Sequence, residues 1–147
     1  MKANKIAAYF IKLSNAKEEN DLTNLKLQKI LYFAQGVWLG ENKGKNELFS
    51  DEIEAWKLGP VIREVYSEYA VCGASPITEL DIPEAIAGDN LSSEIKDFLD
   101  KIWDEYGKFS ASYLVSLTHQ QTPWIKNYKE DQKLIISKSD LASFFVK

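Results

Sequence analysis

Apolar residues recur at helical spacing along the segment LTNLKLQKILYFAQ, which runs from Leu22 to Gln35. The residues that follow the i, i+3, i+4, i+7 spacing of one helical face are Leu27, Ile30, Leu31, Ala34, Val37 and Trp38. Tyr32, Phe33 and Leu39 extend that face around most of the cylinder. A helix that is apolar nearly all round packs among other elements, so this segment predicts the central helix of the domain.

A narrow stripe of this helix is left without large apolar side chains. It holds Lys29, Gly36 and Gly40, and we expect it to be exposed at Lys29. Glycine at the other two positions would let a second backbone approach closely. Thr23 is a suitable N-cap, and the helix is expected to run to about Leu39.

Helical patterns also dominate the rest of the chain. We expect further helices over residues 3–17, from Pro60 to near Cys72, from Ser92 or Ser93 to Tyr106, and from Ser110, Pro123 and Ser137 onwards. The segments 40–50 and 74–90 are expected to be loops, and part of 74–90 to cover the core.

Two short β-like runs, Ile53 to Leu58 and Leu134 to Ile136, are expected to pair. The pattern therefore predicts one mainly α, compact helical domain over residues 1–147, built around a central buried helix with a small two- or three-stranded β element. The large residues expected in its core include Trp56, Trp103, Leu141, Phe144 and Phe145.

Composition fits a small domain that needs no covalent staple. The chain has 147 residues and a single cysteine, Cys72, so it forms no intramolecular disulfide. It contains no apolar run long enough to span a membrane, and the lysine-interrupted N-terminus reads as a helix rather than as a signal peptide. We therefore expect a cytoplasmic protein.

The charge of the chain argues against nucleic acid as its partner. The formal net charge is −4, and Arg63 is the only arginine. Binding to a nucleic-acid backbone needs several cationic phosphate contacts, and arginine makes the commonest base contact. A nucleic-acid-binding regulator that uses a local lysine patch stays open as an alternative.

Residue patterns typical of catalysis are mostly missing. The sequence has no GxSxG, GxxxxGK[ST] or GxGxxG motif, and His119 is its only histidine. No ligand spacing predicts a metal site, and nothing predicts a cofactor. We expect no enzyme, with a small enzyme that uses His119 and a carboxylate as the alternative.

Two local clusters combine aromatic and polar residues. In LTHQQTPW, His119 ends one helix and Trp124 begins the next; in IEAWKLGPV, Trp56 and Lys57 point to opposite faces if the segment is a strand. Each cluster has a structural interpretation, in which His119 bonds helix-end carbonyls and the tryptophans fill the core. Each also has a functional one, because tryptophan is enriched at interface hot spots.

Four segments in order resemble the Panacea-domain family, whose members include SocA-type antitoxins and many phage-associated proteins. They are LTNLKLQKILYFAQGVWL, IEAWKLGPVIREVY, the aromatic helix that ends in IWDEYGKFSA, and LTHQQTPW, and together they cover most of the chain. The resemblance implies a helical domain that binds and neutralises a neighbouring toxin. It also implies, for the SocA type, delivery of the toxin to a Clp protease.

From this resemblance we predict an antitoxin of a prophage or mobile-element toxin–antitoxin module, which occludes its toxin in a direct complex and needs no turnover. The predicted partner is a protein toxin encoded by a neighbouring gene. The residues that we expect at the partner-binding surface are Lys26, Gln28, Lys29, Tyr32, Trp56, Lys57, His119 and Trp124.

Overall fold

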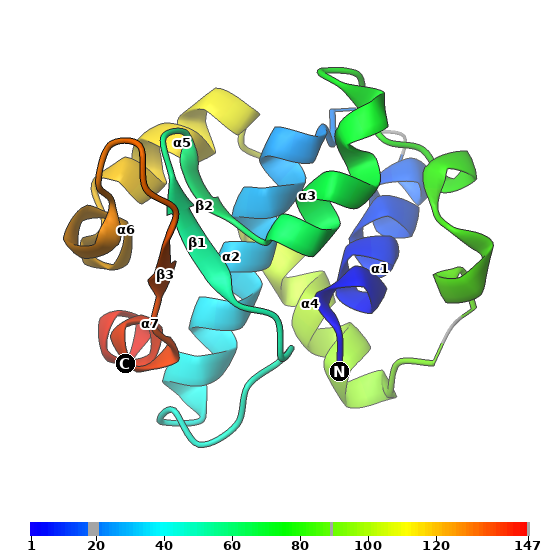
Figure 1. Ribbon diagram of the computed structural model, residues 1–147. Helices are drawn as coiled ribbons and strands as arrows, with labels where there is room; N and C mark the ends of the chain where they lie inside the picture. The colour runs from blue at the N-terminus through cyan, green and yellow to red at the C-terminus, as the bar shows by residue number, and fades with distance from the viewer. Residues whose placement is uncertain (18–20, 89, 147) are drawn as a thin grey trace.

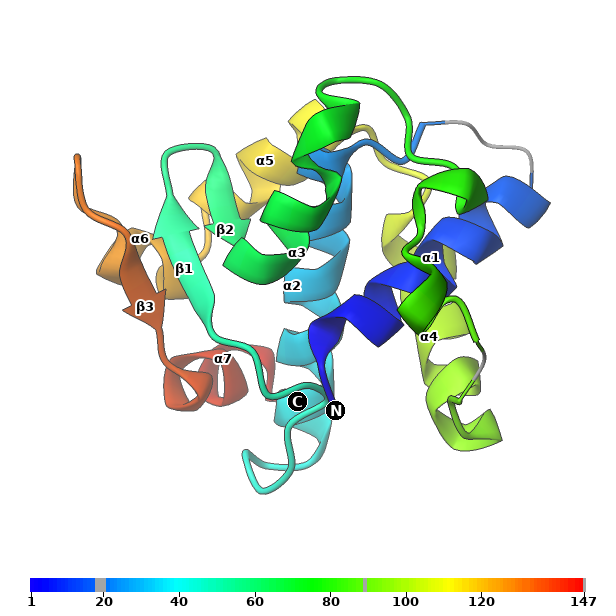
Figure 2. The same ribbon diagram turned by 45° about the vertical axis from the view of Figure 1, so that its right-hand side comes forward.

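The long helix α2 (Asn24–Glu41) runs through the middle of the computed structural model, which describes residues 1–17, 21–88 and 90–146. The sheet lies on one side of α2, and α1 (Ala3–Ala16) lies on the other (Figures 1 and 2). Every residue from 26 to 36 is buried, so the predicted central helix is confirmed. The Thr23 side chain accepts a hydrogen bond from the Lys26 N–H and caps the helix as expected.

Short elements surround this helix. The other helices are α3 (Arg63–Tyr69), α4 (Ser93–Tyr106), α5 (Ala111–His119), α6 (Thr122–Asn127) and α7 (Lys138–Phe145). The strands are β1 (Ile53–Trp56), β2 (Gly59–Val61) and β3 (Leu134–Ile136), and single 3-10 turns lie at Ala70–Cys72, Glu79–Asp81 and Glu84–Ile86. The expected mainly α fold with a small sheet is confirmed.

Serine caps position three of these helices as the sequence predicts. The side chains of Ser92, Ser110 and Ser137 accept the backbone N–H that lies three residues further along. The helix expected from Pro123 begins one residue earlier, at Thr122, because Gln121 is the N-cap of α6 and makes no side-chain cap bond. Ile77 and Ile82 are buried, so the 74–90 connection covers part of the core, as expected.

The three strands form an antiparallel sheet in the order β2-β1-β3, which confirms the predicted pairing of Leu134–Ile136 with β1. Successive side chains of a strand face opposite sides. In β1 the buried Ile53 and Ala55 face the core, so Glu54 and Trp56 lie on the other face. Trp56 is therefore only partly buried and lies outside the core, contrary to the sequence prediction.

The predicted helix start at Pro60 is also wrong. Pro60 belongs to β2, where it pairs with Ala55, and the helix begins only at Arg63. Gly59 has φ +113°, which lets the chain reverse after the two-residue turn of Lys57 and Leu58. Proline has no N–H to give a ladder, and β2 tolerates it because β2 is an edge strand.

The glycine stripe of α2 is covered by α7. A Cβ at Gly40 would lie 2.4 Å from the Phe145 carbonyl oxygen, and one at Gly36 would lie 2.3 Å from the Phe145 ring. The predicted close approach of a second backbone is confirmed. Leu141 is buried as expected, but Phe145 is only partly buried and Phe144 is 40% exposed.

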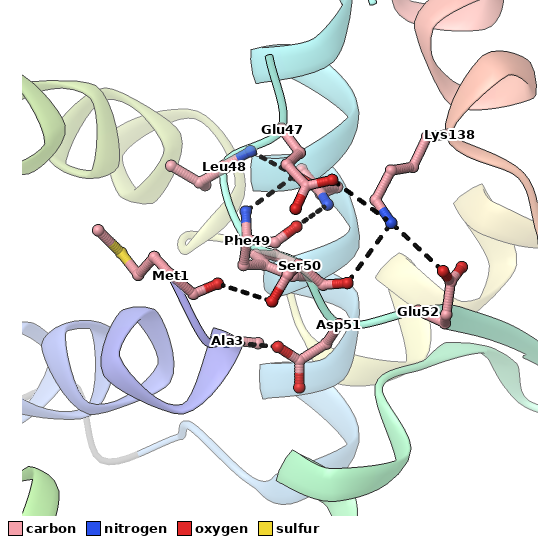
Figure 3. A network of polar contacts seen from close by, with 10 residues as sticks. Met1, Ala3, Glu47, Leu48, Phe49, Ser50, Asp51, Glu52 and Lys138 are labelled. Atoms are coloured by element: carbon pink, nitrogen blue, oxygen red, sulfur yellow. Dashed lines mark hydrogen bonds and ion pairs between the residues drawn. The ribbon is translucent and has the colours of Figure 1, made fainter.

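A polar loop fixes the far end of β1. The Asp51 carboxylate accepts the Ala3 N–H at the start of α1, and the Met1 carbonyl oxygen accepts from Ser50, as Figure 3 shows. The Lys138 ammonium group approaches the Glu47 and Glu52 carboxylates at 3.7 and 3.5 Å. This loop therefore ties the starts of α1 and α7 to the strand that leads to the hairpin.

Candidate partner-binding site

The polar residues of α2 are bonded inside the protein, each to a different segment. The Lys26 ammonium donates to the Gly107 carbonyl oxygen at 2.6 Å and to the Asp21 carboxylate at 2.8 Å. It also lies 5.5 Å from the centre of the Trp103 ring. Lys26 thus joins the start of α2 to the end of α4, although its side chain is fully buried.

Gln28 and Tyr32 make similar connections. The Gln28 side-chain oxygen accepts the Ile62 N–H at 2.9 Å, which fixes the junction between β2 and α3. The Tyr32 hydroxyl donates to the Gln121 side chain at 2.9 Å, at the corner between α5 and α6. Burial raises the pKa of Tyr32, so its hydroxyl stays protonated and remains a donor even in alkaline solution.

Lys29 lies beneath β2. Its ammonium nitrogen donates to the Pro60 carbonyl oxygen at 3.0 Å, and its side chain is fully buried. The expectation that Lys29 lies on an exposed stripe is therefore wrong, because β2 covers this position. Loss of hydration lowers the pKa of Lys29 to about 7, since burial disfavours the charged form.

These four polar residues of α2 are inaccessible in the free chain. We therefore give Lys26, Gln28, Lys29 and Tyr32 a positioning role: they hold the segments that carry the exposed candidates. A buried polar group left without a partner would cost about 1–3 kcal/mol, and each of the four has one.

The other four predicted site residues come together at the β1–β2 turn. We call this group of residues the hairpin corner: Trp56, Lys57, His119 and Trp124. The Trp124 indole N–H donates to the Trp56 carbonyl oxygen at 2.8 Å. The His119 Nε2 lies 3.0 Å from the Lys57 carbonyl oxygen. Helix ends from LTHQQTPW thus hold the backbone of IEAWKLGPV, two segments more than sixty residues apart in the chain.

His119 has a structural environment. Its Nε2 must donate to Lys57, because a carbonyl oxygen can only accept, and its ring stacks on Trp124 with 4.1 Å between centroids. Trp124 in turn stacks on Tyr128 at 4.6 Å. Among the described residues, the contacts of His119 do not include the carboxylate that the enzyme alternative requires.

Trp56 presents its side chain on the outer face of the sheet. The Tyr66 ring packs edge-on against the Trp56 ring, with 4.9 Å between the ring centroids. The Trp56 indole N–H donates to the Glu54 carboxylate at 2.8 Å. The cations of Arg63 and Lys133 lie 5.8 and 5.0 Å from its ring centre. The aromatic ring of Trp56 and the charged groups around it therefore lie at the surface, where Arg63 is paired with Glu54.

Two hollows flank Trp56. One, of about 490 Å³, lies between the turn, α2 and α3, and is lined by Leu25, Leu58, Val61, Tyr66 and Ala70 among others. We call it the hairpin groove. The second, of about 480 Å³, lies between Trp56 and the segment that leads into β3. The sequence patterns do not indicate Leu58 and Tyr66 as surface residues. Their exposure depends on the turn before Gly59, whereas the sequence predicts that a helix begins at Pro60.

The described part of the chain holds no group of three or more His, Cys, Asp or Glu side chains placed to bind a metal ion. None of the described helices combines the length and the apolar character needed to cross a membrane.

Comparison with known proteins relates the chain to one family. The family model described as Antitoxin SocA-like, Panacea domain, matches residues 27–125. This range includes α2 from Leu27 onwards, the hairpin, and both helix ends of the hairpin corner. The protein named Antitoxin SocA from Caulobacter vibrioides (strain NA1000 / CB15N) is 36% identical over 115 residues, which is 70% of this chain and 58% of the relative. No solved structure matches the chain.

Proposed function

Because the chain belongs to the SocA-like antitoxins with a Panacea domain, we propose that it neutralises a protein toxin by forming a direct complex with it. The chain spans 58% of the length of the relative named above, so what that whole protein does reaches this chain only as part of the proposal. The toxin would be the product of a neighbouring gene on a prophage or other mobile element, and the complex would form in the cytoplasm.

The hairpin corner is the surface that we assign to the toxin. Next to its partly buried Trp56 lie Leu58, which is 53% exposed, and Tyr66, which is 38% exposed. Aromatic and apolar side chains within a polar rim are typical of interface centres. The backbone beneath them is fixed by Trp124 and His119, so binding would cost little ordering of the chain.

Occlusion is the mechanism that this arrangement favours. A rigid surface that covers the toxin's active region needs no turnover, and membership of an antitoxin family agrees with a role that is not catalytic. The contacts of His119 support the same proposal, because its ring holds a carbonyl group and an indole rather than a reacting group.

Co-expression with the neighbouring gene tests the function. The neighbour's product should stop growth when it is expressed alone, and this chain should restore growth and co-purify with it. Measuring the toxin's abundance in the same cells separates occlusion from delivery to a Clp-type protease, since occlusion leaves that abundance unchanged. A harmless neighbour, or a toxic one that does not bind at micromolar concentrations, would refute the proposal.

A further inference from the structure

The floor of the hairpin groove has polar side chains that are used inside the protein. Asn24 donates to the Tyr66 carbonyl oxygen at 3.0 Å and accepts from the Gln28 amide at 2.9 Å. The Gln28 oxygen is taken by the Ile62 N–H. These amides therefore hold the groove together and are already engaged before any partner arrives.

The walls of the groove are apolar and partly exposed. They come from Leu25 of α2, Leu58 of the turn, and Val61, Tyr66 and Ala70 of the segment that follows it. Leu58 is 53% exposed, so a partner that covers its side chain removes apolar surface from water, which favours binding. A groove of about 490 Å³ has room for a few apolar side chains of an inserted segment.

Lys57 gives the groove its charge. It is the only charged residue among the described residues that line the groove. The chain as a whole carries a net charge of −4, whereas the one charged side chain in the lining of the groove is positive. An acidic group on a partner would therefore be attracted at Lys57.

We infer that the hairpin groove receives an apolar segment of the toxin and that Lys57 pairs with an acidic side chain of that segment. The inference rests on the proposed antitoxin function and adds the chemistry of the bound segment. Burial of the apolar side chains against Leu58 and Tyr66 provides affinity. The carboxylate at Lys57 fixes the orientation of the segment and excludes basic segments.

The test uses the full chain and the co-purified product of the neighbouring gene. Leu58→Asn and Lys57→Glu should each weaken the dissociation constant by about tenfold or more, the size typical of residues near an interface centre. Lys57→Arg should bind nearly as well as the parent, because it keeps the charge. Both positions lie in an exposed turn, so circular dichroism and the thermal midpoint should stay unchanged.

Matched controls come from the same molecule. Ile135→Asn alters an apolar side chain that is 52% exposed, almost the same as Leu58, but lies on β3 away from the groove. Lys45→Glu makes the same charge change at an exposed position of the loop between α2 and β1. Both controls should bind as the parent does.

The charged partner is then identified by charge reversal. Overlapping peptides of the neighbour's product are tested for binding to the parent chain, and the segment that binds should contain Asp or Glu among apolar residues. Changing that acid to lysine should restore binding to Lys57→Glu. If the product binds but the two groove variants bind as tightly as the controls, the groove assignment is wrong while the antitoxin function stands. If the product neither harms cells nor binds, the function itself is wrong.

Discussion

The ammonium nitrogen of Lys29 lies 3.0 Å from the carbonyl oxygen of Pro60 and has no contact with bulk water. Pro60 lies on the edge strand β2 and has no N–H, and its carbonyl oxygen accepts a hydrogen bond from Lys29. At this residue β2 therefore has no backbone group free to pair with another strand. The turn that carries Trp56, Lys57 and Leu58 is thus supported from below by a buried lysine.

The low pKa of Lys29 predicts a stability that depends on pH. Its pKa falls from 10.5 in the unfolded chain to about 7 in the folded one. Between these values the unfolded chain binds the extra proton, so the free energy of unfolding rises with pH. Below about pH 7 the folded protein carries the full cost of the buried charge. Urea unfolding at about pH 7 and about pH 9 should therefore show a higher stability at the higher pH.

Lys29→Met is the control for this effect. It keeps the volume of the side chain and removes the titrating group, so the rise in stability between the two pH values should largely vanish. Measurements stay below pH 10, because Tyr69 and Tyr106 begin to ionise there in the unfolded chain. Burial raises the pKa of both to about 12 in the folded protein, so above pH 10 this difference lowers the free energy of unfolding. An equal rise in parent and variant would show that another group is responsible.

Lys29→Glu should unfold the domain rather than affect binding alone. A carboxylate at this position would face the Pro60 carbonyl oxygen without a donor and without water. Burial of an unpaired charge costs several kcal/mol, a large share of a typical stability of about 5–15 kcal/mol. Circular dichroism at neutral pH should show loss of helix. A folded Lys29→Glu variant would mean that β2 can lift away from α2.

Trp103 and Trp56 should differ in their contribution to stability. Trp103 is 2% exposed and packs near Phe10 and Lys26. Trp103→Ala should cost about 3–5 kcal/mol and lower the thermal midpoint sharply. Trp56→Ala, on the outer face of the sheet, should cost clearly less. Equal losses from the two variants in chemical denaturation would contradict the assigned faces of β1.

Gly40 should resist substitution by alanine, although alanine is the better helix former. Inside a helix this change normally gains about 1 kcal/mol. Here the new Cβ would lie 2.4 Å from the backbone of Phe145, so α7 would have to move. Overpacking of this kind costs about 1–3 kcal/mol, which exceeds the gain. Thermal unfolding should show Gly40→Ala destabilised, while Gly88→Ala, with open space around it, should be nearly neutral.

Local patterns were sufficient for much of the fold. The apolar periodicity located α2, serine caps located the starts of α4, α5 and α7, and two β-like runs gave the pairing of β1 with β3. Each signal lies within a few residues of the feature that it predicts. The prediction of a helix start at Pro60 is wrong, because Gly59-Pro60 is equally compatible with a turn that leads into a strand. Only pairing with β1 decides between a helix and a strand at this point.

The candidate site required information that a sequence pattern does not contain. Lys26, Gln28 and Lys29 were expected at the partner-binding surface, because the helical pattern does not show which distant backbone group will reach each side chain. In contrast, His119 and Trp124 were recognised with Trp56 and Lys57, yet the bonds that join the two segments form only in the folded chain. Sequence thus gave the components of the hairpin corner but not their assembly.

The bonds beneath the hairpin corner should matter more for binding than for folding. Trp124→Phe keeps an aromatic ring between His119 and Tyr128 but removes the N–H that holds the Trp56 carbonyl oxygen. His119→Ala removes the corresponding bond to Lys57. Each lost hydrogen bond costs about 0.5–1.5 kcal/mol of stability. The turn then becomes more mobile, and the partner must order it again on binding.

We therefore expect a thermal midpoint lowered by a few degrees and a faster dissociation of the toxin complex, measured by surface plasmon resonance. His119→Gln, whose amide can still donate to Lys57, should recover part of the residence time. If both variants lose stability but dissociate as slowly as the parent, the corner supports the fold alone and the toxin binds elsewhere.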